Sequence, residues 1–267
     1  MPEDRTVLIT GASMGLGHAM AEALAEDGWT VFGTSREPEN YSTHGWEMIE
    51  LDVTDDTSVR ACVDGVMERT GRIDALVNNA GYGLSAFAEE ASVEEVRAQF
   101  DTNYLGVHRM NRAVLPIMRR QGRGHIVNIS SLSGLIGTPP SAHYSASKHA
   151  LEGYSQTMRL EVARFGVQVA IVEPGFTESE FRANLAEPAE PIAAYDDLRD
   201  QMRSMNARAE ESATPAIAVA RTVRRVLRTP RPRLRYTCTR TDWLAAHMRC
   251  WLPEGAMHLI VRKVFGV

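Results

Sequence analysis

The stretch SAHYSASKHA (141–150) places a tyrosine and a lysine where they could do acid–base chemistry together. On a helix, residues four apart project from the same face, so Tyr144 and Lys148 would point the same way. A free tyrosine has a pKa of about 10 and is a poor base at neutral pH, but a cation within roughly 4–6 Å lowers that pKa. Such a pair could take a proton from an alcohol or give one to a carbonyl.

Lysine is rare in this chain, which makes its position informative. Lys148 and Lys263 are the two lysines, and the other 27 cations are arginines. A compact ammonium can be aimed at a single oxygen, whereas a guanidinium is broad and planar. We therefore expect Lys148 to be kept for its geometry. The alternative is a surface lysine that survived by chance, as Lys263 could be.

A glycine-rich segment near the N-terminus could hold a phosphate. TGASMGLG (10–17) carries Gly11, Gly15 and Gly17 between an expected strand and an expected helix. Glycines let the backbone turn and approach a pyrophosphate, whose charge is favoured at a helix N-terminus. A tight turn without a ligand is the alternative, but the strand–loop–helix setting favours a dinucleotide.

These residues need a scaffold that brings them together. Apolar runs predict strands at 6–12, 29–35, 46–53, 72–81, 124–131 and 166–175, and periodicity predicts helices at 16–28, 54–70, 92–120 and 143–165. This alternation indicates an α/β fold, a doubly wound parallel sheet of the Rossmann type. The carboxyl ends of its strands share one edge, where functional residues should collect. We expect a single domain over 1–267, with a substrate-binding excursion of one or two short helices at 176–211.

Further motifs follow in a recognisable order and spacing. NNAG (78–81) ends the fourth strand, DTNYLG contains Asn103, NISS (128–131) ends the fifth strand and EPG (173–175) ends the sixth. With T-G-x-x-x-G-x-G and Y-x-x-x-K, they make residues 5–180 resemble the short-chain dehydrogenase/reductase family. FGTSR and EPGF look most like its hydroxysteroid and retinol dehydrogenase branch.

The resemblance implies a catalytic set of Ser131, Tyr144, Lys148 and Asn103. Tyr144 would exchange the proton as hydride moves to or from a nicotinamide, and Ser131 would hydrogen-bond the substrate oxygen. Lys148 would also bond the nicotinamide ribose, and Asn103 would hold a water that links Lys148 to solvent.

The end of the second expected strand favours NADP over NAD. NAD binders usually present an acid there, whereas Ser35 is not acidic and Arg36 offers a planar fork for a 2′-phosphate. A solvated surface arginine is the alternative. The cofactor-binding residues that the resemblance implies are Gly11, Ser13, Gly15, Leu16, Gly17, Arg36, Asp52, Val53, Asn79, Ala80, Gly81, Tyr144, Lys148, Pro174, Gly175 and Thr177. Asp52 would contact the adenine. Met14 and Thr177 depart from the residues usual at their positions.

Taken together, the sequence predicts an NADP(H)-dependent oxidoreductase that interconverts a ketone and a secondary alcohol. An apolar carbonyl substrate is expected from the apolar content of 176–211 and from Leu84, Leu135 and Ile136, although these residues could instead pack the core or an interface. A catalytically silent NADP(H)-binding regulator, or a scaffold that docks a partner or membrane, is the competing function. The intact Ser131, Tyr144 and Lys148 favour the enzyme.

Composition argues against several other classes of protein. Three scattered cysteines suit neither a disulfide framework nor a metal site and favour a cytoplasmic protein, and no apolar run has the length of a membrane span. The acidic body argues against nucleic acid. The long segments 92–120 and 143–165 resemble the pair that forms a dimer interface in the family, so we expect a homodimer or homotetramer.

The chain's charge is distributed unevenly. Residues 1–220 carry a net charge of −14 and residues 221–267 carry +9, which together give −5. Within this basic region, 241–267 has apolar groups at helical spacing, interrupted at Pro253 and Gly255. We favour a lid or interface element there over an amphipathic element on an anionic membrane.

Overall fold

The computed structural model describes residues 5–178, 184–210 and 213–266, except for the side chains of residues 209, 210 and 250. Part of the expected excursion, including Phe181, lies outside these residues. Of the helices in the described ranges, none is both long and apolar enough to cross a membrane.

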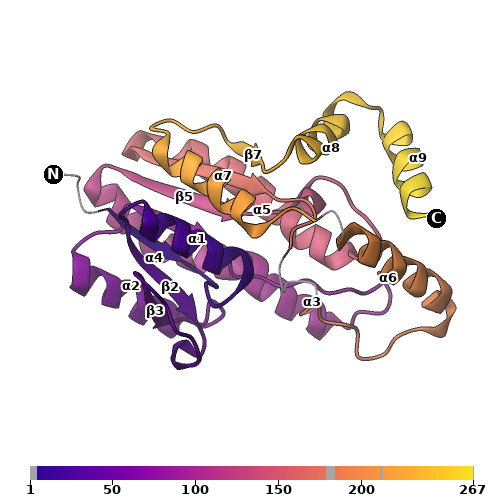
Figure 1. Cartoon of the computed structure of the whole chain (residues 1–267), viewed down its shortest axis with the longest axis horizontal. Coiled ribbons are helices and arrows are strands. Elements are labelled where there is room, and N and C mark those ends of the chain that lie inside the picture. The colour runs from indigo at the N-terminus through magenta and orange to yellow at the C-terminus, as the bar shows by residue number, and fades with distance from the viewer. Residues whose placement is uncertain (1–4, 179–183, 211–212, 267) are drawn as a thin grey trace.

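A seven-stranded parallel sheet forms the centre of the molecule (Figure 1). Its order is β3-β2-β1-β4-β5-β6-β7, so the strand sequence reverses direction between β1 and β4. The strands are β1 (Thr6–Ile9), β2 (Thr30–Ser35), β3 (Glu47–Glu50), β4 (Ala75–Asn78), β5 (Gly124–Ile129), β6 (Val167–Glu173) and β7 (Arg235–Thr237). The first six lie within the ranges that the apolar runs predict. In open sheets of this kind ligands bind at such a reversal, beyond the carboxyl ends of the strands.

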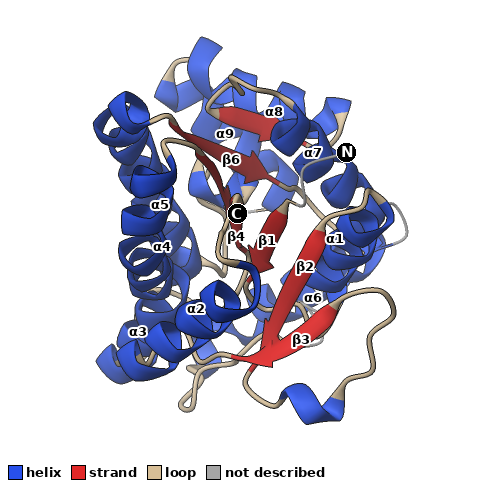
Figure 2. Cartoon of the chain, turned by 90° about the vertical axis from the view of Figure 1, so that its left-hand side faces the viewer, coloured by secondary structure: helices blue, strands red, loops and turns tan. Residues whose placement is uncertain are grey.

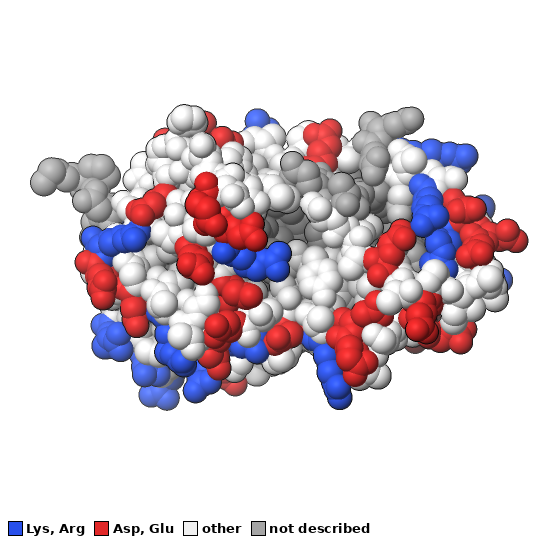
Figure 3. All heavy atoms as spheres, turned by 90° about the horizontal axis from the view of Figure 1, so that it is seen from below, with Lys and Arg blue, Asp and Glu red and all other residues white. Residues whose placement is uncertain are grey.

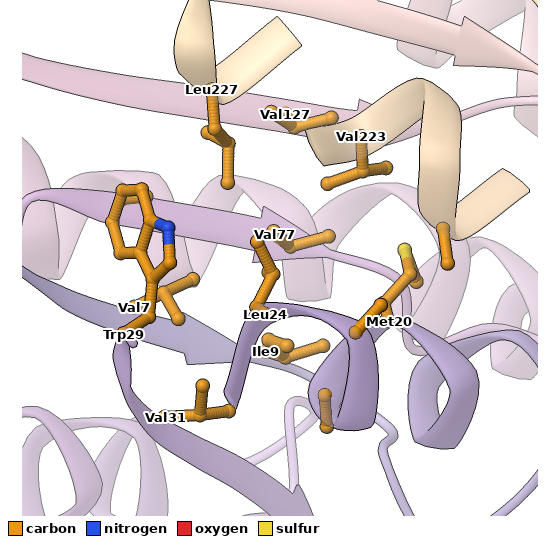
Figure 4. Close-up of a cluster of buried hydrophobic side chains, with 14 of the residues drawn as sticks. Val7, Ile9, Met20, Leu24, Trp29, Val31, Val77, Val127, Val223 and Leu227 are labelled. Carbon is orange, nitrogen blue, oxygen red and sulfur yellow. The ribbon is translucent and has the colours of Figure 1, made fainter. Parts of the chain in front are cut away.

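Helices cover both faces of the sheet (Figure 2). One layer contains α1 (Gly15–Glu26) and α7 (Ala216–Arg228), and the other contains α2 (Asp56–Thr70), α4 (Val107–Gln121) and α5 (Ala142–Val162). Strand side chains alternate between the layers: Val7 and Ile9 pack with α1 and α7, whereas Leu8 packs on the opposite face. Figure 4 shows Met20 and Leu24 of α1 meeting Val223 and Leu227 of α7 over these strands. The result is the expected doubly wound fold, with a buried core on each side of the sheet.

The expected helix at 92–120 is interrupted. It consists of α3 (Val93–Phe100), a π-helical turn (Asp101–Gly106) and α4. Ser92 and Glu95 form a capping box at the start of α3. π-helical turns are rare and occur frequently at functional sites, and this turn contains Asn103. Apolar periodicity cannot reveal a turn widened by one residue.

The C-terminal part of the chain adds elements at one end of the molecule (Figure 1). They are α6 (Asp196–Glu210), α8 (Arg240–Trp251) and α9 (Glu254–Phe265), which follows the predicted break at Pro253. Short 3₁₀ turns lie at Pro38–Asn40, Leu132–Gly134, Ala163–Phe165 and Ala193–Tyr195. The sequence analysis did not identify α7 or β7, and α6 is longer than the expected short helices.

Two backbone bridges hold the excursion against the sheet edge. Thr177 pairs with Thr214, and Leu84, just after β4, pairs with Ala186. A buried ion pair supports them, because Arg199 of α6 donates to Glu90 at 2.5 Å. Tyr195 also stacks on Phe87, with ring centroids 4.4 Å apart. These contacts place α6 next to the carboxyl ends of the central strands.

Candidate active site

The glycine segment turns tightly between β1 and α1. Gly11 and Gly15 have φ values of +66° and +55°, a backbone region that residues with a Cβ seldom adopt. At Gly11 a Cβ would also approach the Cα of Ala80 to 2.9 Å. Gly17 starts the first full turn of α1, where a Cβ would overlap the Gly11 carbonyl oxygen. The loop is thus a bare backbone cradle at a helix N-terminus, which fits a pyrophosphate.

The end of β4 holds this cradle in place. Asn79 donates its side-chain amide to the carbonyl oxygens of Thr10 and Gly11, at 3.0 and 2.8 Å. The hydroxyl of Thr10 accepts the backbone N–H groups of Asn79 and Ala80, both at 2.9 Å. The motifs TGASMGLG and NNAG therefore form one rigid unit. Asn79 and Ala80, which the resemblance assigns to the cofactor site, therefore contact the glycine loop directly.

The adenosine side of the expected site lies at the ends of β2 and β3. Asp52 accepts the backbone N–H and the hydroxyl of Thr54, at 2.8 and 2.7 Å. Burial raises its pKa, but these bonds and the nearby Arg36 and Arg109 outweigh burial and hold the pKa below the usual value. The exposed Arg36 therefore lies close enough to Asp52 to act on it, beside the Ser35 that ends β2. Arg36 and Asp52 therefore lie near each other at the expected adenosine end of the site.

The other residues expected to bind the cofactor lie in the glycine loop, on α1, after β3 and after β6. Ser13 lies in the loop, and Leu16 on α1 packs partly into the core. Val53 is buried against Gly106 of the π-helical turn. The carbonyl of Pro174 accepts the backbone N–H of Leu132 at 3.0 Å, which ties the end of β6 to the segment after Ser131.

The proposed proton donor, Tyr144, lies on the first turn of α5 next to Ser131, which follows β5. Burial raises the pKa of Tyr144 to about 12, and a hydrogen bond with the Ser131 side chain opposes the rise. We expected Lys148 to lower this pKa, so the direction is a correction: in the chain alone, burial dominates. A tyrosine with a raised pKa stays protonated at neutral pH but is a weaker acid, so its transfer of a proton to a carbonyl needs the cation nearby.

Lys148 lies one turn further along α5 and is 5% exposed. Its Nζ is 5.8 Å from the centroid of the Tyr144 ring and donates to the carbonyl oxygen of Ile129 at 2.9 Å. Burial lowers the pKa of Lys148 to about 8, and the carboxylate of Glu152 opposes this shift. Lys148 is therefore an enclosed ammonium, not a surface lysine.

Asn103 of the π-helical turn joins this group through the backbone. Its side-chain oxygen accepts the N–H of Tyr82 at 3.0 Å, and its amide donates to the carbonyl of Tyr82 and to the hydroxyl of Ser147. A Cβ at Gly81 would lie 2.9 Å from the Asn103 oxygen and 3.8 Å from Lys148 Nζ. Asn103, Gly81 and Lys148 are thus neighbours, as the resemblance implies.

A buried polar network beneath the site escaped the sequence analysis. The Asn78 amide donates to Asn111 of α4 at 3.0 Å and to Asn128 of β5 at 2.8 Å. Asn128 in turn donates to Ser155 of α5 at 2.8 Å. These bonds fix the spacing between β4, β5 and both helices. The burial of Asn111 could not be predicted from the sequence, because a lone asparagine in a helix is usually exposed to solvent.

The comparisons agree with this geometry. The family model described as short chain dehydrogenase matches residues 5–190. The chain belongs to this family. It is 37% identical to the 3-ketodihydrosphingosine reductase of Bacteroides thetaiotaomicron, with 99% of each chain covered. It is 39% identical to retinol dehydrogenase 8 of Homo sapiens over 68% of this chain and 61% of that protein, which fits the expected branch.

Solved structures agree as well. A short-chain dehydrogenase from Streptomyces avermitilis superposes with a TM-score of 0.82 at 32% identity, with 100% of this chain and 96% of that chain covered. Other similar structures include complexes with NAD and with NADP. The chain is therefore an oxidoreductase of this family, which uses a nicotinamide cofactor.

Proposed function

We propose that this short-chain dehydrogenase reduces an apolar ketone to a secondary alcohol with NADPH. The observation that carries the proposal is the meeting of Ser131, Tyr144 and Lys148 at the sheet edge that also holds the glycine cradle. A catalytically silent regulator would need the cradle but no buried proton donor. The nicotinamide, when bound, supplies the hydride.

The chain's own residues would hold the carbonyl and deliver the proton. Ser131 orients the substrate oxygen by a hydrogen bond, and Tyr144 donates its phenolic proton to that oxygen. Lys148 keeps a positive charge beside Tyr144, which stabilises the phenolate left behind. Asn103 holds the backbone around Lys148 and lies where a water could relay a proton to it.

Arg36 supports the choice of NADP. It is exposed, follows an uncharged Ser35 and acts on the pKa of Asp52, which supports a role for its guanidinium at a 2′-phosphate. Similar structures hold either cofactor, so they do not decide between them. We therefore base NADP on Arg36 and on the lack of an acid at residue 35.

The substrate class we propose is a ketone on a long aliphatic chain. The relative named 3-ketodihydrosphingosine reductase is similar over the whole chain, which supports a ketone that carries a long alkyl chain. Leu135 and Ile136 follow Ser131 and are only partly buried, which leaves apolar surface near the site. Figure 3 shows a hollow near the middle of one face, with charged side chains along one side of it and uncharged atoms along another.

We propose that α8 and the excursion at 176–211 form one wall of this substrate site. A Cβ at Gly175 would overlap the carboxylate of Asp242, so the start of α8 lies directly against the loop after β6. From the far end of the tail, the carbonyl of Phe265 accepts a hydrogen bond from Gln201 of α6 at 3.0 Å. These contacts favour the lid or interface element over a free membrane anchor.

Trp243 and Trp251 remain exposed on α8, so docking of the tail on a membrane is the alternative to be tested. We expect deletion of residues 241–267 to impair ketone reduction. The contrary result would be full-length protein that pellets with anionic vesicles, together with a truncated form of unchanged kinetics.

We also propose a homodimer or homotetramer in the cytoplasm, assembled through α4 and α5. Leu160 on α5 and Leu105 just before α4 are exposed apolar residues that such an interface would cover. A monomer in sedimentation velocity at micromolar concentration would contradict the assembly.

NADPH oxidation tests the enzyme proposal directly. Purified protein should oxidise NADPH in the presence of long-chain 3-ketones and leave it unchanged without them. Tight NADPH binding with no turnover on any ketone of the panel would favour the regulator instead.

A further inference from the structure

Two buried glutamates lie behind the catalytic lysine. Glu152 is on α5, one turn after Lys148, and is 5% exposed; Glu173 ends β6 immediately before Pro174 and is 1% exposed. Their partner is Arg235 of β7, whose register with β6 pairs it with Ile171, two residues before Glu173. The three charges therefore come from three elements that meet under the active-site edge.

The two acids compete for one N–H group. Glu152 accepts from Arg235 Nε at 2.9 Å, and a Glu173 oxygen lies 3.2 Å from the same nitrogen. That nitrogen carries a single hydrogen, and Arg235 turns another of its nitrogens to Gln156, at 3.4 Å. Among the described residues, the Glu173 oxygen that faces Arg235 has no hydrogen-bond partner, and the second oxygen of Glu152 has only the Ser130 hydroxyl near it.

The single hydrogen of Arg235 Nε cannot bond both buried carboxylates, so one of them is left without a direct partner. An unpaired charge in a protein interior is costly, and a group in that position usually becomes neutral instead. Two carboxyl groups that share a site can hold one proton between them, because they cannot both ionise cheaply. A shared proton would also give the unpartnered Glu173 oxygen a donor.

We propose that Glu152 and Glu173 share one proton at neutral pH and form, with Arg235, an electrically neutral support that positions Lys148. In this state the Lys148 ammonium is the net charge beside Tyr144. Loss of the shared proton would add a second negative charge behind Lys148 and weaken the positive field at Tyr144.

The surroundings are consistent with this charge balance. Burial and the charge of Glu152 raise the pKa of Glu173 to about 8, and Arg235 opposes the rise. Burial also raises the pKa of Glu152, with Ser130, Arg235 and His149 opposing it. From the segment after β7, Cys238 also faces Glu173, and burial raises its pKa to about 12, so the thiol stays neutral.

Two more charged groups complete the environment. Arg225 of α7 and Asp242 of α8 act on Cys238, and Asp242 caps α8 through Thr239. Neither acts on the pKa of Glu152 or Glu173.

The cluster is mechanically joined to the catalytic residues. A Cβ at Gly134 would lie 2.8 Å from the Ser130 hydroxyl and 3.2 Å from Glu152, so Glu152 packs directly under the segment that carries Ser131. The Glu152 carboxylate also raises the pKa of Lys148, in opposition to burial. Changes in the charge of the pair should therefore reach Lys148 over one helical turn.

Infrared spectroscopy of the wild-type protein gives a readout that needs no activity. A protonated carboxyl has a C=O stretching band that a carboxylate lacks. We expect this band at pH 7, its loss as the pH rises past about 8, and its absence from Glu173→Gln at pH 7, where exposed carboxyl groups are ionised. Absence of the band from wild type at pH 7 would overturn the proposal, and that result would not affect the proposed ketone reductase.

Thermal unfolding gives a second readout. The raised pKa of Glu173 means that the folded protein binds its proton more tightly than the unfolded chain does. Wild-type stability should therefore fall as the pH rises from 4.5 to 8. Relative to wild type, the Tm of Glu173→Gln should rise by at least about 3 °C over that window. A difference that stays constant with pH would contradict a shared proton, and the exposed Glu178→Gln is the matched control.

The kinetic readout rests on the proposed function. Glu173→Gln imitates the protonated acid and should keep kcat for ketone reduction within a few-fold at pH 7. Glu152→Gln removes the charge that raises the pKa of Lys148, so the high-pH limit of kcat should move to lower pH. If the high-pH limit of kcat were the same for Glu152→Gln and wild type, the pair would neither position Lys148 nor affect its pKa.

Discussion

Replacement of Lys148 by arginine keeps the charge and changes only its shape, so it isolates the geometry of the site. Lys148 is 5% exposed, its Nζ bonds the Ile129 carbonyl at 2.9 Å, and Gly81 and Asn103 lie on another side. A guanidinium adds two heavy atoms to this enclosed space. Overpacking a core in this way costs about 1–3 kcal/mol, and a lost hydrogen bond from a charged donor costs about 1.5–3 kcal/mol.

These costs can be relieved only by moving the charge away from Tyr144. If about 3 kcal/mol is lost from transition-state stabilisation, kcat falls roughly 100-fold at 1.36 kcal/mol per tenfold. The assay is steady-state NADPH oxidation with a saturating ketone, together with Tm, which shows that the variant is folded at the assay temperature. Lys263→Arg is the matched control, because it changes the other lysine, which is exposed on α9, and it should behave as wild type. A Lys148→Arg enzyme with near-normal kcat would refute the argument that this position needs an ammonium.

Two further changes test the ends of the site. Ser35→Asp combined with Arg36→Ser should lower kcat/KM for NADPH by about 10–100-fold and raise it for NADH, because a carboxylate replaces the phosphate's partner; a wild type that already prefers NADH would contradict the NADP assignment. Glu90→Gln should destabilise the packing of α6 by about 3 kcal/mol, because it leaves the nearly buried Arg199 with only the more exposed Asp196, 3.8 Å away, as a charge partner. Limited proteolysis within 184–210 would show the change. Because the Arg199 guanidinium holds the Glu90 pKa at about 2, this stabilisation is complete above pH 4.5 and is lost as the pH falls toward 2, so wild type and variant should converge there. Equal stability of wild type and Glu90→Gln at pH 7 would show that the ion pair contributes nothing to the stability of the fold.

The fold could be predicted because each early strand carries a continuous apolar run and each helix between them has clear periodicity. The first six strands lie within the expected ranges for this reason. β7 could not be predicted, since its three residues include the charged Arg235 and none is fully buried. α7 went unnoticed although six of its residues are buried, because five arginines between Arg221 and Arg231 made the region look like a solvated basic face.

The expected site residues were recognisable because they stand in short motifs, many at strand ends, where a parallel sheet brings them together, and Tyr144 and Lys148 one turn apart on a helix. Contacts between distant elements had no such signal. Nothing in the sequence connects Glu152, Glu173 and Arg235, because only the pairing of β6 with β7 and the position of α5 bring them into contact. The direction of the Tyr144 pKa also depended on how deeply α5 and the segment after β5 enclose the ring.

The most direct test of the proposed chemistry compares wild type with Tyr144→Phe. The variant removes the phenolic hydroxyl and keeps the ring, so the proton donor is lost while the packing and the glycine cradle remain. We expect ketone-dependent NADPH oxidation to fall by about 10²–10⁴-fold, and NADPH binding measured by nucleotide fluorescence to stay within a few-fold of wild type. A Tyr144→Phe protein that reduces the ketone at the wild-type rate would contradict the central claim that Tyr144 delivers the proton.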